Sequence, residues 1–180
     1  MSRITLITGG SRSGKSSFAQ RLAEEKAGSR LFLATCPATD REMEMRILRH
    51  VRDRRQGNWD TVEEPVHLAD QLHRSDRYDT VLIDCLTLWV NNLQYEALQG
   101  RRVLDEDLMG EETERLLAAA RVHSGEVIMV TNEVGLGIVP VNQAARQFRD
   151  LVGRCNQCVG AAADRVFLVC CGIPLQIKGK

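Results

Sequence analysis

The chain has 180 residues, and its 24 lysines and arginines balance its 24 aspartates and glutamates, so the formal net charge is zero. That balance argues against a general nucleic-acid or membrane-surface binder, because such proteins normally carry a basic excess. The length fits one catalytic domain over residues 1–180. The N-terminus has no apolar signal-peptide core, and no apolar run reaches the length of a membrane span. We therefore expect a cytoplasmic protein that has no membrane span and binds no nucleic acid.

The chain begins with a strand, a glycine-rich loop and a helix. Residues 4–8 are an apolar, β-branched run, and residues 17–26 have a helical pattern. The loop between them reads G-x-x-x-x-G-K-S, the full phosphate-binding P-loop pattern, and consists of Gly9, Gly10, Ser11, Arg12, Ser13, Gly14, Lys15 and Ser16. Its backbone N–H groups and the helix N-terminus suit a phosphate. We expect Lys15 to act on the β- and γ-phosphates of a nucleoside triphosphate, and Ser16 to ligate Mg²⁺.

A second strand at 31–35 precedes a helix over 40–54 that carries an unusual basic stripe. Arg46, His50 and Arg54 lie at i, i+4 and i+8, with Asp53 beside them. One interpretation is a solvated basic face. The other is an anion site, in which arginines bind phosphates and a neutral His50 attacks phosphorus. The spacing alone favours the solvated face.

The next elements lead to a carboxylate at a strand end. A short extended or irregular segment at 59–64 and a possible helix at 66–73 precede a buried-type strand at 80–84. This strand ends in Asp84, where a Walker-B carboxylate would hold Mg²⁺. The alternative is that Asp84 caps the helix expected at 86–98. Because a P-loop is present, we favour the metal role.

The second half of the chain adds helices over 105–123 and 141–163, and strands at 126–131, 165–170 and 173–177. The loop after strand 126–131 is punctuated by glycines and contains Asn132 and Glu133, in a position where substrate contacts are common. A turn at Gly172 separates the last two strands.

The long helix expected over 141–163 carries two stripes. The core stripe consists of Val141, Ala144, Ala145, Phe148, Leu151, Val152 and Cys155, and the second stripe of Asn142, Arg146, Arg149, Gly153 and Asn156. Gly153 costs about 1 kcal/mol relative to alanine in mid-helix, which predicts a close approach by another helix or a ligand. Arg146 and Arg149 either bind a substrate phosphate or pair with carboxylates at a subunit contact.

Apolar strands separated by helices predict an α/β P-loop NTPase fold of the RecA-like class. We expect a mainly parallel sheet with helices on both faces and a short antiparallel C-terminal strand. Ligands of such sheets bind at the carboxyl ends of the strands. This rule brings to one edge the P-loop, Thr35-Cys36-Pro37, Asp84 and residues 131–133. The six cysteines are expected to be reduced and to serve as packing residues.

Four blocks of the sequence are specific when taken together. They are T-G-G-x-R-S-G-K-S at 8–16, R-I-x-x-H-x-x-x-R at 46–54, R-x-x-x-W-x-T-x-E at 55–63, and T-N-E-V-G-x-G-I-V-P followed by N-x-x-x-R-x-F-R-D-x-x-G-x-x-N-Q at 131–157. In these blocks the chain resembles, over essentially its whole length, the bifunctional cobinamide kinase/cobinamide-phosphate guanylyltransferase family of adenosylcobalamin biosynthesis. P-loop proteins at large do not share the last block.

The resemblance implies two reactions on a corrinoid. The first phosphorylates the aminopropanol hydroxyl of adenosylcobinamide with ATP or GTP. The second transfers GMP from GTP to that phosphate, giving adenosylcobinamide-GDP and pyrophosphate. The family does so through a guanylylated histidine, which by motif position is His50, so the resemblance reverses the preference for a solvated face. It also implies Mg²⁺ as cofactor and a homotrimer.

Further nucleotide contacts are implied by the resemblance. They are Thr35, Cys36, Pro37, Val51, Arg52, Asp53, Arg54 and Glu63. We infer that the Glu63 carboxylate accepts hydrogen bonds from guanine, because it suits the N1–H and amino donors of the base. Some relatives have two adjacent histidines where this chain has Arg49 and His50, so Arg49 cannot share a nucleophilic role.

Two other functions fit the P-loop alone. A simple small-molecule kinase would form no covalent intermediate, and a non-enzymatic nucleotide switch gives no reason for the Arg46–His50–Arg54 stripe. The patterns do not locate the corrinoid or show whether one nucleotide site serves both reactions. Glu133 and Asp84 are both candidates for the base that deprotonates the acceptor hydroxyl.

Overall fold

The computed structural model describes residues 2–36 and 58–179, so the helix expected over 40–54 lies outside the described residues. In chain order the described elements are β1 (Ile4–Gly9), α1 (Lys15–Glu24), β2 (Arg30–Ala34), β3 (Trp59–Glu63), α3 (Leu68–Arg74), β4 (Thr80–Asp84), α4 (Leu86–Gln99), α5 (Glu106–Val122), β5 (Glu126–Val130), the 3₁₀ helix η1 (Val134–Leu136), α6 (Gln143–Ala162), β6 (Arg165–Cys170) and β7 (Ile173–Lys178). Among these helices, none combines the length and the apolar character needed to cross a membrane.

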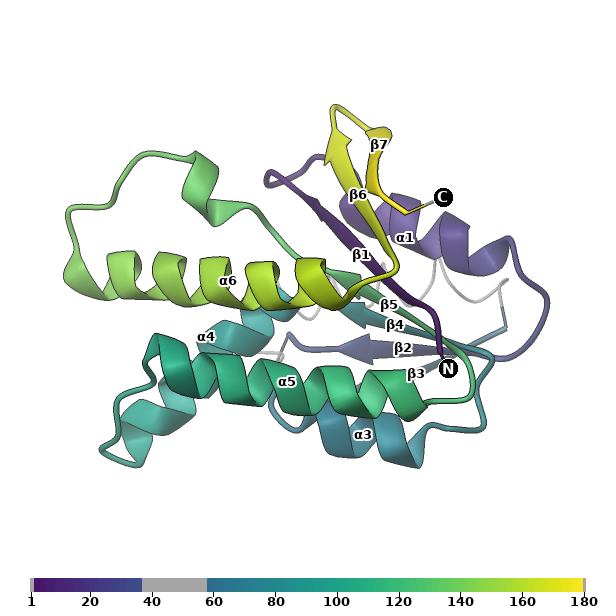
Figure 1. Cartoon of the computed structure of the whole chain (residues 1–180), viewed down its shortest axis with the longest axis horizontal. Coiled ribbons are helices and arrows are strands. Elements are labelled where there is room, and N and C mark those ends of the chain that lie inside the picture. The colour runs from purple at the N-terminus through teal and green to yellow at the C-terminus, as the bar shows by residue number, and fades with distance from the viewer. Residues whose placement is uncertain (1, 37–57, 180) are drawn as a thin grey trace, which may run out of the picture.

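The strands form one seven-stranded sheet in the order β3-β2-β4-β5-β1-β6-β7. All neighbours run parallel except β6 and β7, which are antiparallel. Figure 1 shows α1 on one side of the sheet and α3, α5 and α6 on the other. The predicted fold, a mainly parallel sheet with helices on both faces and an antiparallel C-terminal strand, is confirmed. The segment predicted as extended or irregular at 59–64 is the parallel edge strand β3, whose partly exposed position explains its polar pattern.

The central strands send alternate side chains into two cores, because successive residues of a strand point to opposite faces. Leu31 and Leu33 of β2 face the larger core, which they share with side chains of α3, α4, α5 and α6. Phe32 of the same strand faces the smaller core, where Ala19 and Ala23 of α1 pack. Burial on both faces holds the strands in one register and therefore fixes the positions of their ends.

The carboxyl ends of the parallel strands meet at one edge of the sheet. The register pairs Ala34 with Asp84, and Asp84 with Val130. Beyond the end of β5, the N–H of Thr131 donates to the carbonyl of Ile7 in β1 at 3.0 Å. The prediction that the P-loop, Asp84 and the loop after β5 lie at the same edge is therefore confirmed.

The first turns of the long helix are more exposed than the apolar stripe predicts. α6 begins at Gln143, so Val141 precedes the helix and is 97% exposed, and Ala144 is exposed as well. Their assignment to the core was wrong because this end of α6 extends beyond the sheet (Figure 1). The stripe is buried from Leu151 onward. A methyl group at Gly153 would meet no described atom within 4 Å, so the predicted close approach is not found among the described residues.

The cysteines range from buried to exposed, with Cys36 and Cys158 intermediate. Cys85 and Cys155 are buried, and burial raises the pKa of these thiols to about 11 and about 12. Cys170 and Cys171 are exposed at the turn between β6 and β7, so their assignment as packing residues was wrong. The apolar sequence of β6 predicted that its end would be buried. However, its partner β7 is an exposed edge strand, so the turn between the two strands stays exposed.

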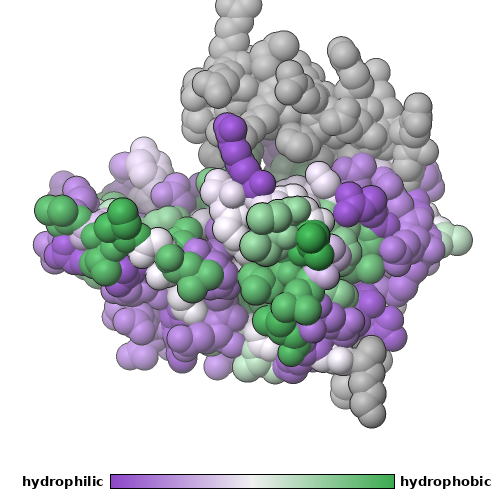
Figure 2. All heavy atoms as spheres, turned by 90° about the horizontal axis from the view of Figure 1, so that it is seen from above, coloured by the Kyte–Doolittle hydropathy of each residue, from purple (hydrophilic) through white to green (hydrophobic). Residues whose placement is uncertain are grey.

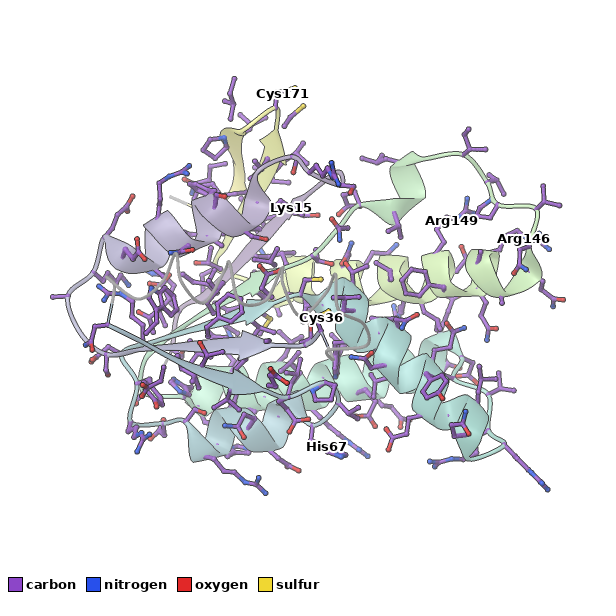
Figure 3. The ribbon with its side chains drawn as sticks, turned by 180° about the vertical axis from the view of Figure 1, so that it is seen from behind. Lys15, Cys36, His67, Arg146, Arg149 and Cys171 are labelled. Carbon is purple, nitrogen blue, oxygen red and sulfur yellow. The ribbon has the colours of Figure 1, made fainter. Side chains whose placement is uncertain are left out.

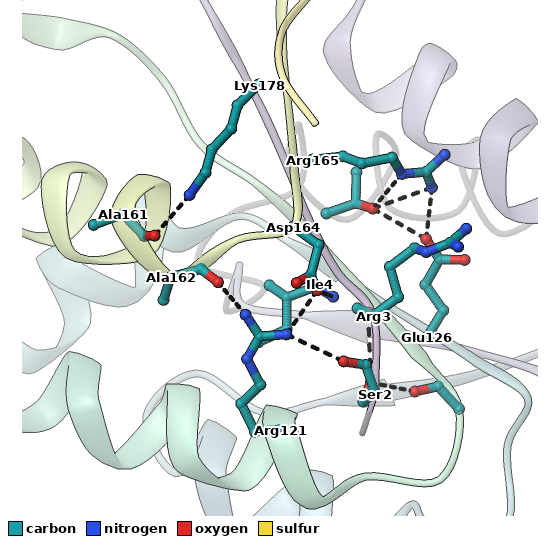
Figure 4. A network of polar contacts seen from close by, with 12 residues as sticks. Ser2, Arg3, Ile4, Arg121, Glu126, Ala161, Ala162, Asp164, Arg165 and Lys178 are labelled. Atoms are coloured by element: carbon teal, nitrogen blue, oxygen red, sulfur yellow. Dashed lines mark hydrogen bonds and ion pairs between the residues drawn. The ribbon is translucent and has the colours of Figure 1, made fainter. Parts of the chain in front are cut away.

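A polar cluster connects the amino-terminal ends of three strands, as Figure 4 shows around Glu126 and Arg165. The Glu126 carboxylate accepts hydrogen bonds from Thr5 Oγ1 at 3.0 Å and from Arg165 Nη2 at 2.7 Å, and it pairs with Lys26 of the segment after α1. Burial alone would raise the pKa of Glu126. The hydrogen bond and charge of Lys26, with Thr5 and Arg165, outweigh burial and hold that pKa below its usual value.

We expect Glu126→Gln to lower the free energy of unfolding at pH 7 by about 2 kcal/mol, because it leaves two cations facing a neutral amide in a mostly buried site. A carboxylate whose pKa is lowered by folding stabilises the protein above its unfolded pKa, and the stabilisation is lost as the pH falls through the folded value. The difference from wild type should therefore be constant near neutrality and shrink below about pH 4. Urea denaturation of both proteins at several pH values measures it, and a pH-independent difference would contradict the ionic explanation.

Candidate active site at the phosphate-binding loop

The P-loop turns sharply between β1 and α1 because its glycines adopt conformations that other residues avoid. Gly9 has φ +148° and Gly14, the N-cap of α1, has φ +97°. No acidic side chain occupies the first turn of α1. The positive end of the helix dipole and the free backbone N–H groups of that turn therefore face the loop without a competing carboxylate, which suits an anionic ligand.

Lys15 is the first residue of α1 and lies inside the loop rather than on the surface (Figure 3). It is 7% exposed, and its Nζ donates to the carbonyl of Gly10 at 2.6 Å. Burial is the main influence and lowers the pKa of Lys15, while the negative charge of Asp84 acts in the opposite direction. The ammonium group is thus held within the loop, beside the position that a bound phosphate would take.

The turn between β6 and β7 supports the loop from the other side. The N–H of Gly172 donates to the carbonyl of Ser13 at 2.8 Å, and a methyl group at Gly14 would lie 3.2 Å from the Cα of Gly172. Gly9 is packed more tightly still, because its added methyl group would lie 2.3 Å from the carbonyl oxygen of Val169. The end of β6 and the turn that follows it therefore hold the P-loop backbone in place.

This packing predicts that alanine destabilises the protein at Gly9 but has little effect at the adjacent Gly10. Gly9→Ala would force the Val169 carbonyl to move, and it would place a side chain on a residue whose positive φ only glycine adopts without strain. We therefore expect it to lower the free energy of unfolding by about 2–3 kcal/mol. Gly10→Ala is the matched control, because a methyl group there meets no described atom within 4 Å. Thermal denaturation of the two variants without nucleotide provides the measurement. Equal melting temperatures for them would contradict the described packing at Gly9.

Asp84 lies at the end of β4, and its charge acts on Lys15. The capping alternative is not supported, because the N-cap of α4 is Cys85. The Ser16 hydroxyl and the Asp84 carboxylate are hard oxygen donors of the kind that Mg²⁺ prefers. No group of three or more acidic, histidine or cysteine side chains that could hold a metal occurs within residues 2–36 and 58–179. This donor set fits Mg²⁺, which usually takes one or two protein ligands and completes its shell with phosphates and water.

Thr35 joins the ends of β2 and β4. Its buried hydroxyl donates to the carbonyl of Cys85 at 2.8 Å and accepts from the Cys85 N–H at 2.7 Å. The Asn92 amide of α4 donates to the carbonyls of Thr35 at 2.8 Å and Pro65 at 3.0 Å. Asn92 was missed in the sequence because nothing in the helical pattern indicates a contact with two distant loops. The predicted nucleotide contacts of Thr35 and Cys36 stay predictions.

Glu63 lies far from the P-loop along the same edge. It is the exposed last residue of β3, and three strands separate β3 from β1. Four strand spacings amount to about 19 Å. A nucleotide held at the P-loop by its phosphates would have to extend along the sheet edge for its base to reach Glu63, as the guanine prediction requires.

A network of polar side chains lies beside the P-loop, at the end of β5. Glu133 Oε1 accepts hydrogen bonds from Thr8 Oγ1 at 2.7 Å and from Asn156 Nδ2 at 3.2 Å. Asn156 also accepts from Thr131 Oγ1 at 2.7 Å and donates to the carbonyl of Asn132 at 3.0 Å. The predicted substrate residues Asn132 and Glu133 are thus brought to the P-loop. Asn156 of the second helix stripe, which had no assigned role, joins α6 to them.

Arg146 and Arg149 do not lie beside the P-loop. Figure 3 shows both on the extended end of α6, apart from Lys15. Arg146 Nη1 donates to the carbonyls of Pro140 at 3.1 Å and Val141 at 2.6 Å, and Arg149 Nε lies 3.5 Å from Asp150 Oδ1. Arg146 therefore holds the loop that leads into its own helix. A substrate or subunit role for either arginine stays a prediction.

The remaining predicted site residues lie outside the described residues. They are Pro37, Arg46, His50, Val51, Arg52, Asp53 and Arg54. The sequence prediction for His50 therefore stands on its motif position.

Exposed apolar side chains gather at two places on the molecule. In Figure 2, hydrophobic surface lies over the loop between η1 and α6 and over the β6–β7 hairpin. They are Leu136 at the end of η1, Ile138, Val139 and Val141 of the loop, and Ile173, Leu175 and Ile177 of β7, all more than half exposed. Contiguous apolar surface of this kind is typical of a contact with another molecule.

Comparisons with known proteins found similar sequences over nearly the whole chain. The cobinamide kinase / cobinamide phosphate guanyltransferase family model matches residues 5–177. The chain is 43% identical to the bifunctional adenosylcobalamin biosynthesis protein CobU of Salmonella typhimurium, over 97% of this chain and 99% of that protein. It is 39% identical to CobP of Pseudomonas aeruginosa, over 97% of both chains. With CobU of Escherichia coli the identity is 40%, over 97% of this chain and 99% of that protein.

Among solved structures, the chain is similar to the KaiC-like protein PH0186 of Pyrococcus horikoshii. The TM-score is 0.52 at 16% identity, and the match covers 92% of this chain and 70% of that one. At this identity the similarity concerns the fold alone, and it agrees with the predicted RecA-like class.

Proposed function

Because the chain belongs to the cobinamide kinase / cobinamide phosphate guanyltransferase family, we propose that one P-loop site serves both activities of this bifunctional enzyme of adenosylcobalamin biosynthesis. The kinase reaction phosphorylates adenosylcobinamide with ATP or GTP. The guanylyltransferase reaction then transfers GMP from GTP to the new phosphate. The observation that carries the proposal is the placement of buried Lys15 within a glycine loop, with the charge of Asp84 acting on it from the end of β4, at the same edge of the sheet.

In the kinase reaction, the loop holds the phosphates while the γ-phosphoryl group moves to the corrinoid hydroxyl. The backbone N–H groups at the start of α1 bind phosphate oxygens, and Lys15 stabilises the charge on the β- and γ-phosphates. Ser16 and Asp84 would hold Mg²⁺, which, when bound, neutralises negative charge on the phosphates. The protein thus positions and stabilises a transfer that needs little covalent chemistry of its own.

In the guanylyltransferase reaction, a different bond of the nucleotide breaks at the same loop. His50 attacks the α-phosphorus of GTP, and pyrophosphate leaves with its two phosphates held by Lys15 and the loop. The corrinoid phosphate then attacks the guanylylated histidine and regenerates His50. A covalent intermediate divides one difficult displacement into two easier ones. Glu63 and residues 51–54 are proposed to bind the rest of the nucleotide.

The assembly and location of the enzyme follow as further proposals. The chain acts as one nucleotide-binding catalytic domain over residues 1–180 in the cytoplasm, and three copies associate through apolar surface. The exposed face of β7 and the apolar loop before α6 support such an association, since isolated exposure of so many branched side chains is unfavourable in water. The partners of this proposal are the corrinoid and two further copies of the chain.

Following two labels into the corrinoid tests the function. With adenosylcobinamide and ATP labelled at the γ-phosphate, the label should appear in the corrinoid. After phosphorylation with unlabelled ATP, GTP labelled at the α-phosphate should give labelled adenosylcobinamide-GDP and unlabelled pyrophosphate. Phosphate transfer without GMP transfer would indicate a simple kinase. The absence of both transfers would favour a nucleotide switch.

A further inference from the structure

Glu133 is a carboxylate with one oxygen held and the other available. Its Oε1 accepts from Thr8 Oγ1 at 2.7 Å and from Asn156 Nδ2 at 3.2 Å. Within residues 2–36 and 58–179 no hydrogen bond to Oε2 and no ion pair of Glu133 is found. As a residue, Glu133 is partly exposed rather than buried. Two donors on one oxygen fix the direction of the other.

The carboxylate lies at the start of the phosphate-binding loop. The N–H of Glu133 donates to the carbonyl of Gly9 at 3.1 Å, and the carbonyl of the next residue, Gly10, accepts from Lys15 Nζ at 2.6 Å. An unpaired carboxylate repels a triphosphate, so its placement beside this loop weakens nucleotide binding unless the negative oxygen is used. Accepting a proton from the group that attacks the phosphate is such a use.

We propose that Glu133 is the general base of the phosphoryl transfer, an assignment that rests on the proposed kinase function. The acceptor hydroxyl of the corrinoid lies between Glu133 Oε2 and the γ-phosphorus. Its O–H bond breaks and the proton passes to Oε2, while the oxygen electron pair forms a bond to the γ-phosphorus. The bond between that phosphorus and the β–γ bridging oxygen breaks, and nucleoside diphosphate leaves. Asp84, whose charge acts on Lys15, keeps the separate role at the phosphates.

Asn156 is a positioning residue for this base. Its Oδ1 is occupied by Thr131 Oγ1 and its Nδ2 bonds both the Asn132 carbonyl and Glu133 Oε1. These three contacts orient the amide so that its N–H₂ faces Glu133. Replacing Asn156 removes one of the two hydrogen-bond donors to Glu133 Oε1. The Glu133 carboxylate then loses its fixed orientation but keeps its charge.

The test measures the kinase reaction and the GMP-transfer reaction separately in Glu133→Gln. This variant keeps the shape of the side chain and an oxygen that accepts a hydrogen bond from Thr8. We expect kcat for cobinamide phosphorylation to fall about 10²–10⁴-fold, the usual contribution of a general base, with KM for ATP within about threefold. The acid limb of the pH–rate profile should disappear. Transfer of GMP from GTP to the protein should persist, because that step uses no acceptor hydroxyl. Glu114→Gln, an exposed change on α5, is the matched control and should leave kcat unchanged.

Asn156→Ala should lower kcat about tenfold with little change in KM, and should have no further effect when Glu133 is already Gln. Additive effects of the two changes would show a merely structural role for Asn156. Kinase activity retained by Glu133→Gln at the wild-type rate would overturn the assignment while leaving the proposed function intact. If wild-type protein transfers no phosphate to cobinamide, the proposed function itself fails. If Glu133→Gln is unstable, Glu133→Asp provides the second variant, and full loss of its acid limb would count against the base.

Discussion

Replacing Lys15 with alanine should reduce both cobinamide phosphorylation and GMP transfer by at least about 10²–10³-fold, the usual effect of removing a preorganised charge from a transition state. Both reactions depend on the same ammonium group, because it stabilises the β- and γ-phosphates whether they carry the transferred group or leave as pyrophosphate. Since Lys15 is 7% exposed and burial lowers its pKa, folding holds it in the loop at a cost in desolvation. The melting temperature should therefore not fall in this variant.

The measurement is kcat/KM for each reaction in Lys15→Ala and in the control Lys178→Ala. Lys178 is an exposed lysine at the end of β7 that donates to the carbonyls of Gly160 and Ala161, at the edge of the sheet opposite the P-loop. The Lys178→Ala variant should retain both activities. A Lys15 variant that loses one reaction and keeps the other would contradict the claim that one loop serves both.

Replacing His50 with alanine should reduce formation of adenosylcobinamide-GDP by at least about 10³-fold and change kcat of the kinase reaction by less than about threefold. The reason is that a nucleophile is needed only for the step that passes through the protein, whereas phosphorylation transfers the γ-phosphoryl group directly to the corrinoid. The two products are measured separately by chromatography after incubation with ATP alone and with GTP.

His67→Ala is the control, because His67 is an exposed residue before α3 and has no assigned role in either reaction. It should form both products at wild-type rates. Loss of both reactions in His50→Ala, with the fold intact by circular dichroism, would show that His50 acts in nucleotide binding rather than as a nucleophile of one step.

Features encoded within short segments could be predicted from the sequence. The P-loop was recognised from eight consecutive residues, and its flanking strand and helix are found where they were expected. The place of Asp84 at the same edge followed from the rule that parallel strands share one direction. The register that pairs Asp84 with Val130, and Ile7 with Val130, bears this out.

Features that depend on contacts between distant segments could not be predicted. In the sequence, Asn156 was placed only by its helical spacing. Its hydrogen bonds to Asn132 and Glu133 form because α6 crosses the end of β5. Asn92 likewise reaches Thr35 across 57 positions of the chain. The exposure of Val141 was missed for the same reason, since hydrophobicity alone does not show that a helix extends beyond its sheet.

The most direct test of the central claim is to trap GMP on the protein. Wild-type enzyme and His50→Ala are incubated with GTP labelled at the α-phosphate, denatured, and examined for protein-bound label. A phosphoramidate of histidine should give label on the wild-type chain that is lost in acid and kept in base, and none on His50→Ala. Absence of label on the wild type, or equal label on both proteins, would contradict the guanylyl-histidine mechanism.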